Sequence, residues 1–302
     1  MHLTPNPRYA YSAIVDRPAY DWPGGARLAV YLGLNVEHFA WGRGGGHMTH
    51  NWGNPNDQRN FAWRDYGLRV GLWNILAVLD GLGLSCCHLL NSTVCDHAPR
   101  IVEAIGARGE EVIGHGRTNS ERQADFHEDD ERRLIRETTE TIAQHLGRRP
   151  QGWMGPWISE SAVTSDLLKE EGYRFTMQWP CDDQPVWLAT RAGPLLSVPY
   201  PAEINDSPAI LNRGHTAEEF AQFMIDQFDM MLRLSERAPL VCAFALHTFV
   251  LGPPFRLLHL ERALSHIAAH RGDPRVWLTT PGAIAEHAMS LPAGIVPGPS
   301  AS

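Results

Sequence analysis

The stretch "RLAVYLGLNVEH", residues 27–38, is almost entirely apolar until it ends in polar side chains. Continuous apolar character without alternation is typical of a strand that is buried on both faces, as in a parallel sheet covered by helices. Seven further apolar runs lie along the chain, at 84–90, 111–115, 152–156, 173–179, 195–201, 240–247 and 275–280. Because these runs alternate with helical patterns, the sequence predicts an α/β fold with a mainly parallel sheet.

Clear helix signals separate the apolar runs. Residues 128–147 place apolar side chains at helical spacing, begin with acidic residues and stop at Gly147. Thr216 and Glu219 have the spacing of a capping box that opens another helix. Seven or eight strand–helix units in one series predict a closed or nearly closed α/β barrel, with a doubly wound open sheet as the alternative.

The series contains no internal repeat and no long linker. We therefore expect one domain over residues 1–302, with a core at about 26–290 and an N-terminal arm at 1–25. The Gly-rich segment 39–62 is irregular in pattern, and we interpret it as a surface loop or lid.

Composition excludes several classes of partner. The formal net charge is -8 and the pI is near 6.0, which argues against binding to nucleic acid. The first 25 residues contain no uninterrupted apolar run, so we expect neither a secretory signal nor membrane association, and a cytoplasmic location. The 5 cysteines are odd in number and scattered, which favours buried free thiols over a thiolate metal site.

Polar residues gather where the apolar runs end. In α/β barrels the chemistry takes place at the carboxyl ends of the strands, so these residues are the candidates for function. They are Asn35, Glu37, His38, His115, Arg117, Asn119, Trp157, Glu160, Asp182, Asp183, Gln184 and His247. We expect two histidines and at least two carboxylates to converge on one barrel mouth.

Glu37, His115 and His247 are the strongest candidates. Glu37 follows so apolar a run that its carboxylate would be desolvated unless used or paired, although a solvated loop position is the alternative. His115 lies between two glycines, which favours access for a ligand over a role as an ordinary turn histidine. His247 ends a wholly apolar run, where the alternative is a core histidine with satisfied hydrogen bonds.

The remaining candidates have more ordinary alternatives. Arg117, beside His115, suits a clamp for a carbonyl or anionic group, or else an ion pair. Asp183 is taken as functional on the assumption that its neighbour Asp182 caps a turn. Three tryptophans suit stacking on a flat substrate, with packing between loops as the alternative: Trp157, Trp179 and Trp187.

The residue types fit hydrolysis. A carboxylate can take a proton from water, and a histidine on the opposite side can protonate a leaving nitrogen or stabilise an oxyanion, as Glu37 and His247 would. The motifs occur in the order "NVEH" (35–38), "HGRTN" (115–119), "GWMGPW" (152–157), "DDQPVW" (182–187) and "LHTFVLGPPFR" (246–256). This order resembles the polysaccharide deacetylase superfamily, also called the NodB-homology or carbohydrate esterase family four fold. It is closer to the branch that contains metal-independent allantoinases.

The resemblance implies a deformed (β/α) barrel of about seven parallel strands. It also implies hydrolysis of a non-peptide C–N bond, either in an N-acetyl amide or in a cyclic ureide, with a small molecule as substrate and assembly into dimers or tetramers. Substrate contacts would come from Trp157, Asn119 and Trp187. The alternative is a catalytically inactive barrel that binds a carbohydrate or another small molecule.

The resemblance leaves two cofactor states open. Aligned by motif, Glu37 falls on the family's catalytic base, His38 and His115 on metal ligands, and Asn119 on the position of a second ligand histidine. One divalent, zinc-like metal held by Glu37, His38 and His115 is chemically acceptable, although asparagine is a poor zinc ligand. Without a metal, Arg117, His247 and nearby backbone amides would polarise the carbonyl.

Overall fold

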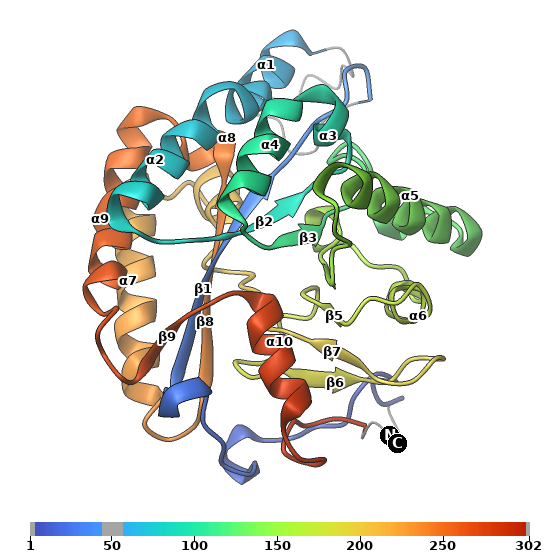
Figure 1. Cartoon of the computed structure of the whole chain (residues 1–302), viewed down its shortest axis with the longest axis vertical. Helices are drawn as coiled ribbons and strands as arrows, with labels where there is room; N and C mark the ends of the chain where they lie inside the picture. The colour runs from blue at the N-terminus through green and yellow to red at the C-terminus, as the bar shows by residue number, and fades with distance from the viewer. Residues whose placement is uncertain (1–3, 44–56, 300–302) are drawn as a thin grey trace.

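The computed structural model describes residues 4–43 and 57–299, and within them a nine-stranded sheet forms the centre of the molecule (Figure 1). The strands are β1 (Leu28–Val36), β2 (Cys87–Leu90), β3 (Val112–Gly114), β4 (Gly152–Trp153), β5 (Phe175–Thr176), β6 (Val186–Leu188), β7 (Leu195–Ser197), β8 (Leu240–His247) and β9 (Val276–Leu278). Their order is β6-β7-β5-β4-β3-β2-β1-β8, and β9 pairs with β1. The pairing is parallel throughout except between β6 and β7.

Irregular backbone covers the free edge of β8. Val241 donates its N–H to the carbonyl of Asp183, and Ala245 donates to that of Ile204. These bonds nearly close the sheet into a deformed barrel of mainly parallel strands, as predicted. The doubly wound open sheet is wrong as an alternative, because a doubly wound sheet leaves both edges open.

Ten α-helices are present in the described ranges: α1 (Gln58–Tyr66), α2 (Leu72–Leu82), α3 (Thr93–His97), α4 (Pro99–Arg108), α5 (Glu128–Leu146), α6 (Thr164–Glu170), α7 (Ala217–Leu234), α8 (Thr248–Leu251), α9 (Pro254–Ala269) and α10 (Pro281–Ser290). Short 3-10 or π turns lie at η1 (Ile14–Asp16), η2 (Pro23–Gly25), η3 (Gly67–Gly71), η4 (Gln123–Asp125), η5 (Pro156–Ile158) and η6 (Ser207–Asn212). In Figure 1, α2, α7 and α9 lie along one side of the paired strands β1 and β8. None of the described helices is long and apolar enough to cross a membrane.

The local helix signals are confirmed. α5 begins with four acidic residues and ends at Gly147, whose φ of 67° is the left-handed conformation that glycine adopts without steric cost. Thr216 and Glu219 form the predicted capping box at the start of α7. The expected loop at 39–62 is shorter than predicted, because α1 already begins at Gln58, and residues 44–56 lie outside the described ranges.

Side chains of β1 and β8 alternate between two apolar cores. Even-numbered positions such as Leu34 and Phe244 pack in the core beneath the helices. Odd-numbered positions such as Tyr31 and Ala245 pack in the inner core, inside the curl of the sheet. This is the ordinary two-residue period of a strand, and it decides which polar residues at the strand ends face the interior of the barrel.

The N-terminal arm closes the opposite end of the barrel, where the parallel strands begin. Trp22 is buried, and its indole N–H donates to the carbonyl of Leu240 at the start of β8 (3.1 Å). Arg17 forms an ion pair with Asp182 at 2.6 Å. A cavity lies at the other end of the barrel, at the carboxyl ends of the strands.

Candidate active site

A cavity of about 260 Å³ lies at the carboxyl ends of the strands. The polar and aromatic residues around it that matter chemically are Glu37, Arg64, His115, Asn119, Trp157 and His247. The register of the sheet explains part of this set, since Asn35 of β1 pairs with His247 of β8 and both occupy inward-facing positions. Glu37 continues the same alternation one step beyond β1.

The carboxylate of Glu37 is the centre of the site. Its Oε1 atom is 3.5 Å from Nε2 of His115 and 3.5 Å from Nε2 of His247. Asn119 donates a hydrogen bond from Nδ2 to the same oxygen. Burial alone would raise the pKa of Glu37, but the charge of His247 holds it well below its usual range, so the carboxylate is charged at neutral pH.

His247 is held between two carboxylates. Its Nδ1 lies 2.6 Å from Oδ1 of Asp206, and its backbone N–H donates to Oδ2 of the same residue at 2.8 Å. Burial by itself lowers the pKa of His247, but Asp206 and Glu37 outweigh burial and raise the pKa to about 10. The ring is therefore an imidazolium at neutral pH, oriented by Asp206 and facing Glu37.

His115 presents a hydrogen-bond acceptor to the cavity. Its Nδ1 faces the carbonyl of Met154, which can only accept, so the hydrogen is assigned to Nδ1 and, in the neutral ring, Nε2 is the acceptor. Within the described residues, Nε2 is buried without a hydrogen-bond partner. Nε2 of His115 and Oε1 of Glu37 are thus two acceptors 3.5 Å apart, an arrangement that a donor such as water or a substrate N–H would satisfy.

The glycines beside His115 serve packing and turning rather than exposure. A Cβ at Gly114 would lie 2.7 Å from Cε3 of Trp153, and Gly116 has a φ of 64°. The His115 side chain itself is almost completely buried. A ligand would reach it through the cavity, which His115 lines, and not from the outer surface.

The loop after β4 forms one wall of the cavity under backbone strain. Trp157 and Ile158 are the described non-glycine residues with positive φ, at 67° and 54°. Such values are costly for an isoleucine and persist where surrounding contacts enforce them, often at functional sites. One such contact is the indole N–H of Trp157, which donates to the carbonyl of Asn119 at 3.0 Å.

His38, predicted as a metal ligand, does not lie at the cavity. Its ring stacks on that of His97 at 4.2 Å between centroids, and its Nδ1 is 2.9 Å from Oγ1 of Thr93. Burial and the neighbouring His97 lower the pKa of His38 to about 4. The reason is the alternation of side chains, because residue 38 follows the inward-facing Glu37 and points the other way. The predicted ligand set of Glu37, His38 and His115 is therefore not assembled.

Arg117, predicted as a carbonyl clamp, forms ion pairs instead. Its guanidinium binds Glu121 at 3.0 Å and Glu137 of α5 at 2.7 Å, and it does not line the cavity. This is the ordinary ion-pair alternative. The buried arginine at the cavity is Arg64 of α1, whose side chain the sequence did not single out.

Asp183 and Trp187 lie away from the site. The carbonyl of Asp183 bonds Val241 at the start of β8, and β8 rises by about 3.3 Å per residue from there to His247, so the two regions are roughly 20 Å apart. Trp187 lies in β6, the antiparallel strand that the sequence did not predict, and packs against the inner core. The third tryptophan, Trp179, packs edge-on against Tyr9.

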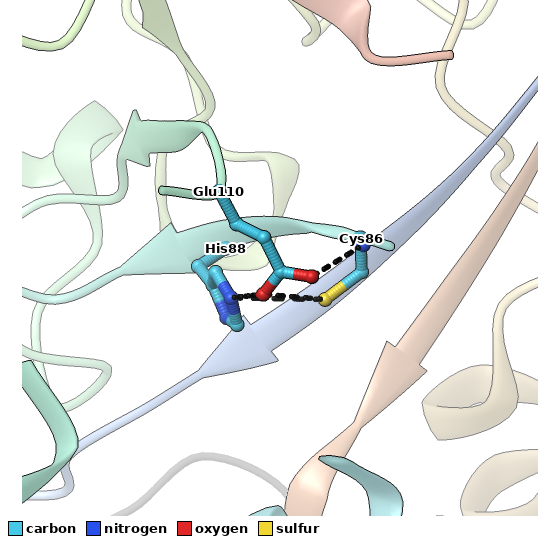
Figure 2. Close-up of side chains that lie close together, drawn as sticks. All are labelled: Cys86, His88 and Glu110. Carbon is cyan, nitrogen blue, oxygen red and sulfur yellow. Dashed lines mark hydrogen bonds and ion pairs between the residues drawn. The ribbon is translucent and has the colours of Figure 1, made fainter. Parts of the chain in front are cut away.

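A second group of potential ligands lies near the amino-terminal ends of β2 and β3 (Figure 2). His88 lies in β2, Cys86 lies directly before that strand, and Glu110 reaches them from the segment before β3. Their Sγ, Nε2 and carboxylate oxygen atoms lie within 4.8 Å of one another, which is the spacing of a group that can hold a metal ion. The scattered cysteines had favoured buried free thiols over a thiolate site.

Hydrogen bonds within this group and to Arg108 already occupy the atoms that would bind a metal ion. Nε2 of His88 is 2.7 Å from Glu110, and Arg108 binds both carboxylate oxygens of Glu110. A metal on Nε2 would move the ring hydrogen to Nδ1, which is buried without a partner in the described structure. Burial would raise the pKa of Glu110, but His88 and Arg108 lower it to about 2, so the carboxylate is charged. We interpret the group as a buried ion-pair network.

Glu110→Gln should destabilise the fold without affecting catalysis. Removing one partner of a buried ion pair leaves the others uncompensated and costs about 3–5 kcal/mol, which urea unfolding would measure. The matched control is Glu103→Gln, because Glu103 pairs with Arg100 on the surface and should cost under about 1 kcal/mol. A metal that is bound by the wild type and absent from Glu110→Gln would instead assign a metal site to this group.

The chain resembles known proteins in sequence and in fold, although no family model matches it. A curated protein of Schizosaccharomyces pombe, named "Putative polysaccharide deacetylase", is 26% identical over 246 residues, which cover 74% of this chain and 73% of the relative. The crystal structure of Puue allantoinase has a TM-score of 0.80 at 24% identity and covers 91% of this chain and 96% of its own. That of a "probable Polysaccharide deacetylase from Pseudomonas aeruginosa PAO1" has a TM-score of 0.81 at 24% identity, with 91% and 97% covered.

These findings confirm the fold that the motifs indicated and support the resemblance to the family. The deformed barrel is shared with both solved structures over nine tenths of the chain. The relative found by sequence supports the resemblance to the polysaccharide deacetylase superfamily.

Proposed function

We propose that this chain hydrolyses a non-peptide C–N bond in a small cyclic ureide. The observation that carries the proposal is the contact of one Glu37 oxygen with both His115 and His247, at 3.5 Å each, in the wall of one cavity. A charged carboxylate can take a proton from water as it attacks an amide carbonyl. A neighbouring imidazolium can stabilise the oxyanion and protonate the leaving nitrogen. The names of the related proteins, deacetylases and an allantoinase, support this class of reaction.

In the proposed mechanism, water lies between Oε1 of Glu37 and Nε2 of His115, which both accept its hydrogen bonds. Glu37 takes one proton while the water oxygen attacks the carbonyl carbon. The His247 imidazolium stabilises the oxyanion and then donates its proton to the leaving nitrogen. A C–O bond forms and the C–N bond breaks. The proton on Glu37 then returns to His247, 3.5 Å away, which restores the starting state.

Unpaired acceptors around the cavity favour a ureide as the substrate. Within the described residues, three buried lining atoms lack a hydrogen-bond partner: Oδ1 of Asn35, Oδ1 of Asn119 and Nε2 of His115. A buried acceptor without a donor is unfavourable, so the bound state should supply N–H or O–H groups. A cyclic ureide carries several N–H groups on one small plane, whereas an N-acetyl group carries one.

Deacetylation of an N-acetyl sugar is the second candidate. The names of the curated relative and of one solved structure favour it. The size of the cavity, about 260 Å³, favours a small free molecule over a polymer segment. A catalytically inactive binding barrel is the remaining alternative.

A substrate panel tests the proposed function. Hydantoin, allantoin and N-acetylglucosamine would be incubated with the wild type and with Glu37→Gln, and the products identified by mass. Ring opening of a hydantoin or of allantoin that depends on Glu37 supports the proposal. Release of acetate alone would support the second candidate. If no product depends on Glu37, the catalytically inactive binding barrel is the alternative that remains.

We further propose that the reaction proceeds without a bound metal. His247 also lines the cavity, but as an imidazolium it cannot bind a metal ion. This leaves Glu37, His115 and the amide oxygen of Asn119, a set that fits zinc only weakly because amide oxygen is a poor zinc ligand. The His247 imidazolium supplies the positive charge that a metal would otherwise provide.

Removing divalent ions should therefore change turnover by less than about twofold. The protein would be dialysed against dipicolinate, its metal content measured by elemental analysis, and its rate compared with that of the untreated protein. Loss of activity on chelation, with recovery on addition of one equivalent of zinc or manganese, would contradict the metal-free mechanism.

A further inference from the structure

Tyr200 brings a hydroxyl group into the wall of the cavity. It lies shortly after β7, its side chain is buried, and it lines the same cavity as Glu37 and His247. Its hydroxyl oxygen is 3.1 Å from Nδ2 of Asn35 in β1. Asn35 pairs in register with His247 of β8, and Glu37 follows Asn35 on the same face of the chain. The Tyr200 hydroxyl therefore borders the part of the cavity where Glu37 and His247 meet.

The amide of Asn35 leaves the hydrogen of this hydroxyl unused. Nδ2 of Asn35 also donates to the carbonyl of Leu246 at 3.1 Å, and a carbonyl can only accept. That contact identifies the NH₂ end of the amide, because the reverse orientation would set two oxygens against each other. The Tyr200 hydroxyl therefore accepts a hydrogen bond from Asn35, and its own hydrogen has no acceptor among the described residues.

The hydroxyl of Tyr200 is a donor and not a base. Burial raises the pKa of Tyr200 well above its usual range. The hydrogen bond from Asn35 opposes this shift, and the carboxylates of Asp206 and Glu37 add to it. The phenol is therefore protonated at neutral pH. Negative charge that develops on a substrate oxygen would meet a donor that is already in place, which is how an enzyme stabilises an oxyanion at little cost in reorganisation.

From this arrangement we propose that the Tyr200 hydroxyl donates a hydrogen bond to the substrate oxygen that becomes the oxyanion. The inference rests on the proposed function and adds a residue to its mechanism. The hydroxyl binds the oxyanion together with the His247 imidazolium and still holds it when His247 passes its proton to the leaving nitrogen. Tyr200 itself gives up no proton. Its hydrogen bond strengthens as charge moves from Glu37 to the substrate oxygen, so it stabilises the transition state more than the bound substrate.

Tyr200→Phe tests the inference by turnover, because it removes only the hydroxyl group. With a substrate that the panel above identifies, kcat should fall by about 10²- to 10³-fold and KM should stay within about threefold. The matched control is Tyr31→Phe. Tyr31 is also a buried tyrosine of the inner core, its hydroxyl donates to the carbonyl of Pro199 at 2.6 Å, and it does not line the cavity. This control disturbs the backbone directly before Tyr200 without removing a donor from the cavity, so its kcat should stay within about threefold of the wild type.

A binding measurement tests the same point without turnover. Glu37→Gln carries a neutral amide in place of the base, so it resembles the site after the base has taken its proton. Two probes would be titrated into this protein and into its double variants with Tyr200→Phe and Tyr31→Phe: methylphosphonate, a tetrahedral anion like the intermediate, and acetamide, a neutral planar carbonyl compound. Tyr200→Phe should raise the Kd of methylphosphonate by about 10- to 100-fold and that of acetamide by less than about threefold. Tyr31→Phe should change either Kd by less than about twofold.

The tyrosine signals of the Glu37→Gln protein give a readout that needs no substitution at Tyr200, and it serves if the phenylalanine variant does not fold. With isotope-labelled tyrosine rings, the Cζ signal of a tyrosine shifts when its hydroxyl begins to donate to an anion. The chain has 7 tyrosines, so each signal can be followed separately. We expect methylphosphonate to shift the signal of one tyrosine and acetamide to shift the same signal less.

The outcomes separate this inference from the proposed function. Equal weakening of both probes by Tyr200→Phe, or equal effects of the two phenylalanine variants, would show a structural role and overturn the inference. So would failure of methylphosphonate to bind the Glu37→Gln protein, or the lack of a shifted tyrosine signal. Failure of the proposed function looks different, because no product would then depend on Glu37 while methylphosphonate still bound selectively through Tyr200. Turnover that depends on Glu37 and is unchanged by Tyr200→Phe would leave the proposed function standing and remove Tyr200 from it.

Discussion

Glu37→Gln is expected to lower kcat by at least about 10³-fold, since general base catalysis contributes roughly 10²- to 10⁴-fold and this carboxylate also stabilises the imidazolium. Glutamine keeps the size of the side chain and removes both the negative charge and the ability to take a proton. The cited contacts of Glu37 are with three residues of the site, His115, His247 and Asn119. The substitution should therefore lower kcat more than it changes KM.

Asp183→Asn is the matched control for this substitution. It is also a change from a carboxylate to an amide, at a residue once expected in the site, and it lies near the start of β8 about 20 Å from His247. We expect its kcat and KM to stay within about twofold of the wild type. Retention of full activity by a folded Glu37→Gln protein would contradict the mechanism, and circular dichroism and thermal unfolding would establish that the variant is folded.

Long apolar strands made the fold and two site residues predictable. β1 and β8 are each buried along their whole length, so the residues at their ends, Glu37 and His247, were evident from the pattern. Parallel strands place their carboxyl ends at one edge, which brought His115 to the same place. The same alternation, continued one residue past Glu37, turns His38 away from the cavity, and the alignment by motif does not take this alternation into account.

The antiparallel strand β6 explains why Asp183 and Trp187, which the sequence placed at the site, lie far from it. The segment 182–187 has the pattern of a motif at the end of a strand. In the structure it leads into β6, a short strand that runs antiparallel to β7. Its polar residues therefore lie at the amino-terminal end of the barrel. A three-residue strand carries no direction in its sequence, so this reversal is a tertiary feature.

Asp206 and Arg64 could not be found from local pattern. Asp206 lies in "INDSP" (204–208), a composition typical of turns, and its burial results from a long-range pairing of Asn205 with Ala245 of β8. Arg64 lies in a weakly amphipathic helix after a long irregular segment. In both cases the chemistry depends on contacts between segments far apart in the chain.

Asp206→Asn should reduce kcat by roughly 10²- to 10⁴-fold and move the alkaline limit of activity. Asp206 accepts hydrogen bonds from both the backbone N–H and the ring of His247 and is completely buried. Its own pKa is raised, because burial outweighs the attraction of His247. An asparagine still fits the space, but its NH₂ group can face Nδ1 of His247. A donor in that place disfavours a hydrogen on Nδ1, and the imidazolium requires a hydrogen on both ring nitrogens.

The direction of the pH effect follows from the charge on His247. Activity requires the imidazolium, so kcat in the wild type should fall as the pH rises through a value near 10. Asp206 is the larger of the two carboxylate contributions that oppose burial and raise this pKa, and removing its charge lets the pKa of His247 fall. The alkaline limb of the variant should therefore lie at lower pH than that of the wild type.

Measurement of kcat from pH 5 to pH 11 distinguishes this effect from simple loss of structure. Asp182→Asn is the control, because Asp182 pairs with Arg17 at the other end of the barrel and should leave the profile unchanged. A merely structural role for Asp206 would lower activity by the same factor at every pH. An unshifted alkaline limb in the variant would mean that a group other than His247 is the acid, and the imidazolium would then serve only to hold Glu37 in its charged form.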